Sequence, residues 1–146
     1  MRALNYHRIL KLNEVYETEK SIYLVTDFIH DKTLELLFKK SSWQTSVPKP
    51  ETKNIMFSLL KTLAYMASKG VIHRNIKPAS ILMEDSTDIK IINFNLAIFV
   101  DSSNENFRTC GTPGYIAPEI FLAEKTTGKY NNKCDVFSAG CIFFQM

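Results

Sequence analysis

Two short polar segments, separated by apolar runs, constrain the fold of this chain more than any other feature. The first is HRNIKPAS at residues 73–80, and the second is NFN at residues 93–95. Between them, β-branched and other apolar residues at 81–83 and 89–92 surround a polar turn at 84–88. This pattern predicts two short strands joined by a turn. One polar segment therefore precedes the predicted strands, and the other follows them directly.

Both segments resemble loops of the protein kinases, in which a catalytic loop of pattern H-R-D-x-x-x-x-N precedes a metal-binding D-F-G. Two more motifs follow in the family's order, GTPGYIAPE at residues 111–119 and DVFSAG at residues 135–140. A lone A-P-E triplet is weak support, but four ordered motifs are specific. The chain is therefore identified as a member of the protein kinase superfamily, similar to the serine/threonine, calmodulin-dependent type. The resemblance covers residues 4–146.

The resemblance implies an α+β fold, here a partial protein-kinase-like one in a single domain over residues 1–146. Residues 1–27 resemble a small-lobe remnant with two strands, residues 28–31 the hinge, and residues 32–146 a mainly helical, truncated large lobe. At 146 residues the chain can bury a core but is shorter than a kinase domain. The Gly-rich phosphate loop and the ATP-binding lysine strand have no counterpart, since the first glycine is Gly70.

The periodicity of the remaining segments predicts the elements around these motifs. Apolar residues four apart predict an amphipathic helix that ends before a glycine. Polar and proline-rich stretches predict loops. We expect strands at 9–16 and 22–27 joined by a polar turn, helices at 33–40 and 51–69, a loop at 41–50, irregular structure at 93–119 and a buried helix from about 135.

The chemical groups that a kinase needs are replaced within the motifs. Asn75 stands where the resemblance places the catalytic Asp, and a neutral amide is a poor proton acceptor. Ser80 and Asn93 stand at the metal-ligand Asn and Asp positions, so we expect no metal site and no magnesium. Asn95 replaces the glycine of D-F-G and is the next most tolerant residue of positive φ. Lys77 matches a lysine that contacts the transferred phosphate, and it reads equally well as a solvated loop lysine.

Other residues match structural positions of the family. His73 and Phe94 correspond to two members of a packed hydrophobic column, and Leu12 corresponds to a third. A satisfied core histidine is the better interpretation of His73 than a catalytic one. Arg74 matches an arginine that pairs with a phosphorylated activation loop. Thr109 is a candidate for that phosphate, and an ordinary loop threonine is an equally good reading.

The last two motifs carry three further structural or regulatory residues. Thr112 lies in the activation-segment end. Glu119 of the A-P-E triplet corresponds to a glutamate that pairs with an arginine beyond Met146. Asp135 matches a buried aspartate that hydrogen-bonds the backbone of the catalytic loop.

A weak nucleotide pocket is also implied by the resemblance. Thr26 matches the gatekeeper, Asp27 and Ile29 match hinge positions that bond adenine through their backbone, and Leu82 matches the apolar floor. These residues are read equally well as ordinary strand and core residues. We therefore expect no cofactor, with ATP bound weakly at most.

Composition excludes several classes of protein. The net charge of +3 is too small to indicate nucleic acid or a membrane surface as a partner. Cys110, Cys134 and Cys141 form no C-x-x-C, which argues against a zinc site or disulfide framework. We expect Cys141 in the core and Cys110 exposed. Free thiols suit a reducing compartment, and the first residues lack the apolar core of a signal peptide. We therefore expect an intracellular, cytoplasmic protein.

The apolar run at residues 136–144 matches a helix that kinases bury on nearly all sides. The helices that cover it in the family would follow Met146. We therefore expect exposed phenylalanines on this helix and a tendency to aggregate.

These residues favour a catalytically degenerate kinase domain, or pseudokinase, that binds or regulates another protein such as an active kinase or a kinase substrate. We expect no enzyme activity. One alternative is a residual ATP-dependent serine/threonine kinase, and another is a non-functional truncated gene product. A transcript that extends beyond either end would separate the last possibility from the others.

Overall fold

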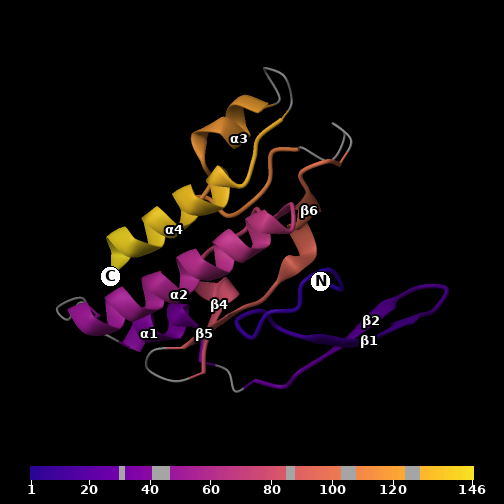
Figure 1. The fold of residues 1–146 in the computed structure, drawn as a ribbon, viewed down its shortest axis with the longest axis horizontal. Helices are drawn as coiled ribbons and strands as arrows, with labels where there is room; N and C mark the ends of the chain where they lie inside the picture. Colours follow the sequence, from indigo (N-terminus) through magenta and orange to yellow (C-terminus); the bar gives the residue numbers. More distant parts are fainter. Residues whose placement is uncertain (30–31, 41–46, 85–87, 103–107, 124–128) are drawn as a thin grey trace.

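The computed structural model describes residues 1–29, 32–40, 47–84, 88–102, 108–123 and 129–146. It is an α+β fold in which helices predominate and the strands are short (Figure 1). Its elements in chain order are β1 (Leu12–Glu17), β2 (Ile22–Thr26), α1 (Leu34–Lys40), α2 (Lys49–Ser68), β3 (Val71–Ile72), the 3₁₀ turn η1 (Pro78–Ser80), β4 (Ile81–Met83), β5 (Ile89–Ile91), the 3₁₀ turn η2 (Phe94–Leu96), β6 (Ile98–Phe99), α3 (Pro118–Ala123) and α4 (Lys133–Gln145).

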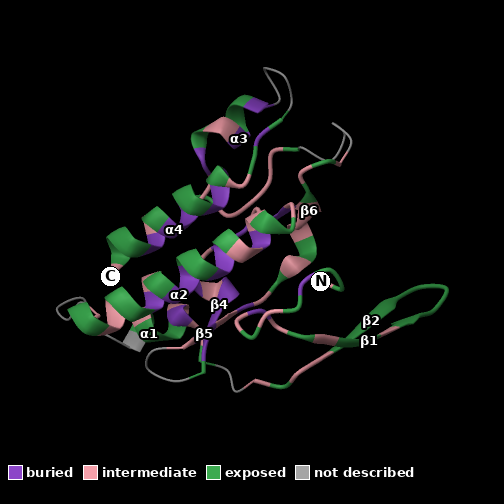
Figure 2. Cartoon of the chain, viewed as in Figure 1, coloured by how far each residue is buried: buried purple, intermediate pink, exposed green. Residues whose placement is uncertain are grey.

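Helix α2 organises the core. Its residues Ile55, Leu59, Leu63 and Met66 recur at helical spacing and are buried, as the 3.6-residue period requires. α4 lies alongside α2 (Figure 1) and contributes the buried side chain of Ile142 to the same cluster. Figure 2 shows the buried faces of both helices turned inward and their opposite faces exposed.

The strands form three antiparallel pairs, β1 with β2, β3 with β6 and β4 with β5. In the β4–β5 pair, Ile81 faces Ile91 and Leu82 faces Lys90. The chain before β1 joins this pair, because Ile9 forms a parallel bridge with Ile91 and is itself buried. The β3–β6 pair holds together the two ends of the region that contains both polar segments.

Several expected boundaries shift in the structure. The first strand begins at Leu12 and not at residue 9, because Ile9 pairs with β5 instead of with β2. α2 begins at Lys49, two residues before the expected start, since Pro50 in the first turn needs no backbone N–H partner. Residues 93–119 are less irregular than expected, because η2, β6 and the start of α3 lie within them. Residues 30–31 of the expected hinge and 41–46 of the expected loop lie outside the described residues.

Strand β2 and helix α4 both expose large apolar side chains. Strand β2 exposes Ile22, Tyr23 and Leu24, because no other described element packs closely on the faces of the β1–β2 pair. α4 exposes Phe143 and Phe144, the latter with 92% of its surface accessible, as the apolar run predicts. No helix within the described ranges has the length and hydrophobicity needed to cross a bilayer.

Candidate functional site

The loop at residues 73–80 connects β3 to β4, includes η1 and is anchored from α4. The carboxylate of Asp135 accepts the backbone N–H of His73 at 2.7 Å and that of Arg74 at 2.8 Å. Asp135 is buried, and burial raises its pKa to about 6 although the two N–H donors and Arg74 act in the opposite direction. The hydrogen bonds expected of Asp135 are therefore present, and they link the first turn of α4 to the loop.

His73 is buried and satisfied. Its Nδ1 accepts the backbone N–H of Asn75 at 3.2 Å, so its Nε2 carries the proton and donates it to the carbonyl of Ile92 at 2.9 Å. Burial lowers the pKa of His73 to about 4, so the ring is neutral at pH 7. The ring also packs edge-on against Phe94, with centroids 4.9 Å apart. His73 thus positions the loop, and both of its ring nitrogens are hydrogen-bonded to the backbone.

Asn75 lies in a network of neutral groups. Its side-chain Oδ1 accepts the hydroxyl of Thr112 at 2.8 Å, which ties the catalytic-loop position to the activation-segment motif. Its backbone carbonyl accepts the hydroxyl of Ser80, also at 2.8 Å. Both Asn75 and Ser80 are buried. The structure therefore brings three of the expected site residues together without any carboxylate among them.

The residues at the metal-ligand positions do not fit a magnesium ion. Mg²⁺ requires oxygen ligands in near-octahedral geometry and is usually held by carboxylates. The hydroxyl of Ser80 points inward to the carbonyl of Asn75, and Asn93 offers a neutral amide from an exposed position. Within the described ranges, no three His, Cys, Asp or Glu side chains are close enough to share a metal ion.

The backbone at the second polar segment differs from the expectation. Asn93, and not Asn95, adopts positive φ, at 68°. Asn95 lies inside η2, whose turn follows immediately. Asn tolerates the left-handed region better than most residues, so the neutral replacement at position 93 still permits this turn.

Arg74 adopts positive φ of 66° and directs its side chain toward the activation segment. Its Nε donates to the carbonyl of Leu96 at 2.5 Å, and a terminal nitrogen donates to the hydroxyl of Tyr130 at 3.0 Å. Tyr130 in turn donates to the carbonyl of Arg108 at 3.0 Å. Thr109 follows Arg108, and its hydroxyl donates to the carbonyl of Ile120 at 3.2 Å. Two hydrogen bonds of the Tyr130 hydroxyl therefore connect Arg74 to Arg108, the residue before Thr109.

Tyr130 is the residue of this network that the sequence motifs missed. It is buried, and burial raises its pKa to about 12 although its hydrogen bond from Arg74 acts in the opposite direction. The available signal was a single aromatic residue in an otherwise polar stretch just before α4.

The positions expected to form a nucleotide pocket are spread over two regions. Thr26 and Asp27 lie at the end of β2, where Asp27 accepts the side-chain amide of Asn13 at 2.9 Å. Leu82 is buried in β4 and forms an antiparallel bridge with Thr33. Ile29 is half-buried at the edge of the described chain.

The remaining expected residues occupy separate places. Leu12 is half-buried and pairs with Thr26 at the base of the first hairpin. It is absent from the buried cluster against which Phe94 packs. Glu119 lies in the first turn of α3, and Lys77 is half-buried just before η1.

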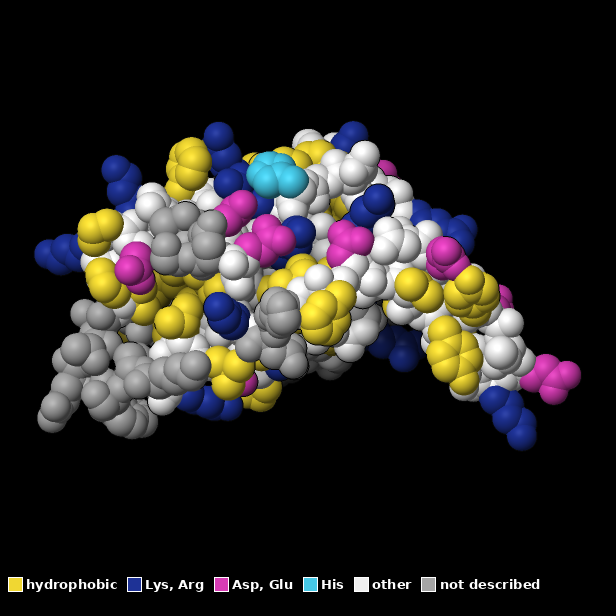
Figure 3. Space-filling model, turned by 90° about the horizontal axis from the view of Figure 1, so that it is seen from below, with side chains coloured by type: hydrophobic (Ala, Val, Ile, Leu, Met, Phe, Trp, Pro, Cys, Tyr) yellow, Lys and Arg dark blue, Asp and Glu magenta, His cyan; other side chains and the backbone are white. Residues whose placement is uncertain are grey.

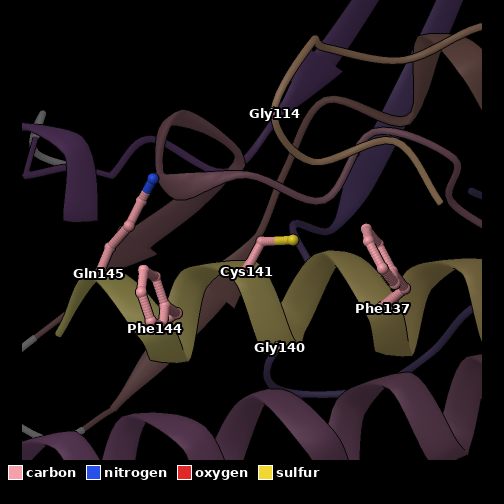
Figure 4. A pocket seen from close by; sticks show the side chains of 6 residues that line it. All are labelled: Gly114, Phe137, Gly140, Cys141, Phe144 and Gln145. Carbon is pink, nitrogen blue, oxygen red and sulfur yellow. The ribbon is translucent and has the colours of Figure 1, made fainter. Parts of the chain in front are cut away.

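A shallow cavity of about 400 Å³ lies along α4 (Figure 4), and no residue of either polar segment is among its lining residues. Its apolar lining comes from Phe137, Cys141 and Phe144, and Gly114 closes one side. Cys141 is half-buried here, and Cys110 is half-buried too, so neither is placed as the sequence suggested. The open side of the helix meets no other described element, which leaves Cys141 at the rim instead of in the core.

Comparison with known families matches residues 1–146 to the protein kinase domain. The chain belongs to the protein kinase family. Calcium-dependent protein kinase 5 of Plasmodium berghei (strain Anka) is 39% identical over 147 residues, which cover 99% of this chain and 25% of that protein. Serine/threonine-protein kinase DCLK3 of Mus musculus is 35% identical over 148 residues, covering 99% and 18%. Serine/threonine-protein kinase cds1 of Schizosaccharomyces pombe is 29% identical over 150 residues, covering 100% and 32%.

The chain thus spans between about a fifth and a third of the length of these kinase relatives. The α+β architecture is that of part of a kinase fold. The division into small-lobe, hinge and large-lobe segments stays a prediction.

Proposed function

We propose that this chain is a catalytically silent protein kinase domain that acts as a binding or regulatory scaffold for an active kinase or a kinase substrate. The observation that carries the proposal is Asn75. The motif resemblance assigns it to the position of the catalytic base. In the structure it is buried, and its Oδ1 accepts the hydroxyl of Thr112. An amide oxygen can orient a hydroxyl, but it does not accept the proton as a carboxylate does.

The metal positions support the same proposal. Ser80 uses its hydroxyl within the loop, and Asn93 supplies no charge. Phosphoryl transfer depends almost entirely on positioning and on metal stabilisation of the phosphates. Asp135 still anchors the loop at residues 73–80, so the domain keeps its folded surface for recognising another protein. It lacks the charged metal ligands that phosphoryl transfer needs. Its three free thiols suit the cytoplasm.

The competing function is residual ATP-dependent serine/threonine phosphorylation. The kinase names of the relatives and the presence of Lys77 favour it. A radiolabelled-ATP assay with purified chain and a mixed peptide substrate tests it directly. We expect no turnover, because loss of a general base alone costs about 10²–10⁴-fold. Sustained turnover that Lys77→Ala abolishes would overturn the proposal.

A double substitution that restores the base and one metal ligand tests whether Ser80 alone prevents activity. We expect Asn75→Asp combined with Asn93→Asp to remain inactive, because Ser80 still donates its hydroxyl to the loop and provides no second metal ligand. Activity in that double variant would show that Ser80 is compatible with the metal. The matched control is Asn54→Asp, an exposed change on α2 that adds charge away from the loop.

Nucleotide binding is tested separately from turnover. We expect ATP to raise the melting temperature little or not at all. We expect Mg²⁺ to add nothing to that rise, since neither Ser80 nor Asn93 carries a carboxylate. A large rise with ATP that requires Mg²⁺ would contradict this expectation. The same titration with ADP serves as a control for binding through the adenine positions alone.

A further inference from the structure

The first surface that the proposed function leaves unused is the hairpin arm, defined as residues 12–27. β1, β2 and their turn project from the body of the molecule (Figures 1 and 3). The arm carries four acidic side chains and one basic one, a net charge of −3. It also exposes large apolar side chains, among them Tyr16, Tyr23 and Leu24. Acidic and apolar groups are therefore mixed on one accessible arm.

The second surface is the outer face of α2, defined by Lys49, Lys53, Phe57, Leu60 and Lys61. These residues recur at spacings of three and four and are all exposed, so they share the helix side opposite the core. The Nζ of Lys61 lies 4.6 Å from the centre of the Phe57 ring. No acidic residue of α2 is exposed on this side, because Glu51, its one carboxylate, is half-buried. The outer face is therefore basic and apolar.

We propose that the hairpin arm of one copy of this chain docks on the outer face of α2 of a second copy. The two surfaces have opposite charge, and both expose aromatic and aliphatic side chains that lose water on contact. Within one chain the arm extends away from α2 (Figure 1), so the match is made between copies. This inference is independent of whether the domain transfers phosphate.

Charge selects this head-to-tail arrangement over symmetric ones. Arm against arm would oppose the carboxylates of Glu14, Glu17 and Glu19, and α2 against α2 would oppose lysines. Like charges across an interface disfavour it. A heterologous contact also leaves one free arm and one free face on every assembly. Association is therefore open-ended, it rises with protein concentration, and added salt weakens it because the Debye length shortens.

Charge reversal with mixing tests the proposal by sedimentation velocity and light scattering. The helix variant is Lys53→Glu with Lys61→Glu, and the arm variant is Glu17→Lys with Glu19→Lys. We expect the unchanged chain to exceed its monomer mass of 16.8 kDa as concentration rises. Each variant alone should associate about tenfold more weakly, since both of its surfaces then carry the same sign. An equimolar mixture should associate again, because each variant supplies the surface that the other has lost.

The matched control is Lys129→Glu with Lys133→Glu, which changes the net charge as the helix variant does but lies outside both surfaces. It should associate like the unchanged chain. All substituted side chains are exposed, and far-UV circular dichroism checks that each variant folds. If a variant fails to fold, carbodiimide cross-linking of an isotopically mixed, unchanged sample decides the question. Intermolecular links should join Lys53 or Lys61 to the arm glutamates.

The proposal is overturned if the unchanged chain stays monomeric. It is also overturned if either charge-reversed variant alone associates as strongly as the unchanged chain. The second outcome would move the contact elsewhere, including to the exposed face of α4. A mixture that remains monomeric, or cross-links confined to other lysines, would overturn it as well.

Discussion

Gly111 offers the sharpest test of how the activation-segment motif is held against the loop at 73–80. Its φ is +122°, a conformation that side-chain-bearing residues rarely adopt. A Cβ at this position would lie 3.0 Å from the carbonyl oxygen of Arg74 and 3.0 Å from Cγ1 of Ile116. The oxygen belongs to the backbone of a residue that is itself held at positive φ, so it has little freedom to move.

Gly111→Ala therefore carries two costs. The backbone conformation costs about 1–3 kcal/mol for a residue with a side chain, and crowding in a packed site costs about 1–3 kcal/mol more. A loss near the middle of the combined range is a large part of the 5–15 kcal/mol typical of a folded domain. With a urea m-value of roughly 1–3 kcal/mol per molar, the unfolding midpoint should fall by about 1 M or more.

Two glycines of the same chain serve as matched controls. Gly114 has φ of +90° with open space around a Cβ, so Gly114→Ala isolates the backbone cost. Gly140 lies in α4 with no atom within 4 Å of a Cβ, so Gly140→Ala should stabilise the helix by about 0.5–1 kcal/mol. Urea unfolding followed by circular dichroism should rank the midpoints Gly140→Ala, unchanged chain, Gly114→Ala and Gly111→Ala. Equal losses at Gly111 and Gly114 would refute the close contact with Arg74.

Three further predictions concern acidity, the Arg74 network and α4. Between pH 6.5 and 4 the unfolded chain binds a proton at His73 and the folded one does not, so stability falls on acidification. Asp135, with its pKa raised to about 6, acts in the opposite direction between about pH 6 and 4. Asp135→Asn should therefore steepen the loss of stability from pH 6 to 4.5 by about 1.4 kcal/mol per pH unit; parallel urea-midpoint curves would contradict this. Tyr130→Phe removes a hydroxyl that bonds both Arg74 and the Arg108 carbonyl, and should cost about 1–2 kcal/mol. Tyr23→Phe, at an exposed position, should leave the urea midpoint unchanged. Phe144→Lys should change the free energy of unfolding by less than about 0.5 kcal/mol, because this side chain is 92% exposed. It should also slow irreversible aggregation measured by light scattering, since it removes an exposed apolar group. An unchanged aggregation rate would show that Phe144 on α4 does not drive aggregation.

The sequence by itself determined the family, the order of the motifs and the neutral side chains at positions 75, 80 and 93. These are local properties, since a motif is read along the chain and an amide has no charge in any fold. The amphipathic period of α2 could also be predicted, because apolar residues recur on one face of a helix every 3.6 residues. Short elements could not be predicted from the sequence. β3 and β6 have two residues each, and they form because they pair with each other across the chain.

Tertiary structure alone decided which residues those motifs meet. Ile9 is not part of the first strand, because it pairs with Ile91, 82 positions farther along the chain. The local hydrophobic pattern cannot predict a pairing between residues so far apart. Tyr130 belongs to the site because folding places the segment just before α4 next to Arg74 and Arg108. The same holds for the positive φ, which the folded chain places at Asn93, directly before η2, and not at Asn95. Contacts between residues distant in sequence depend on the packed fold, so only the folded structure could assign them.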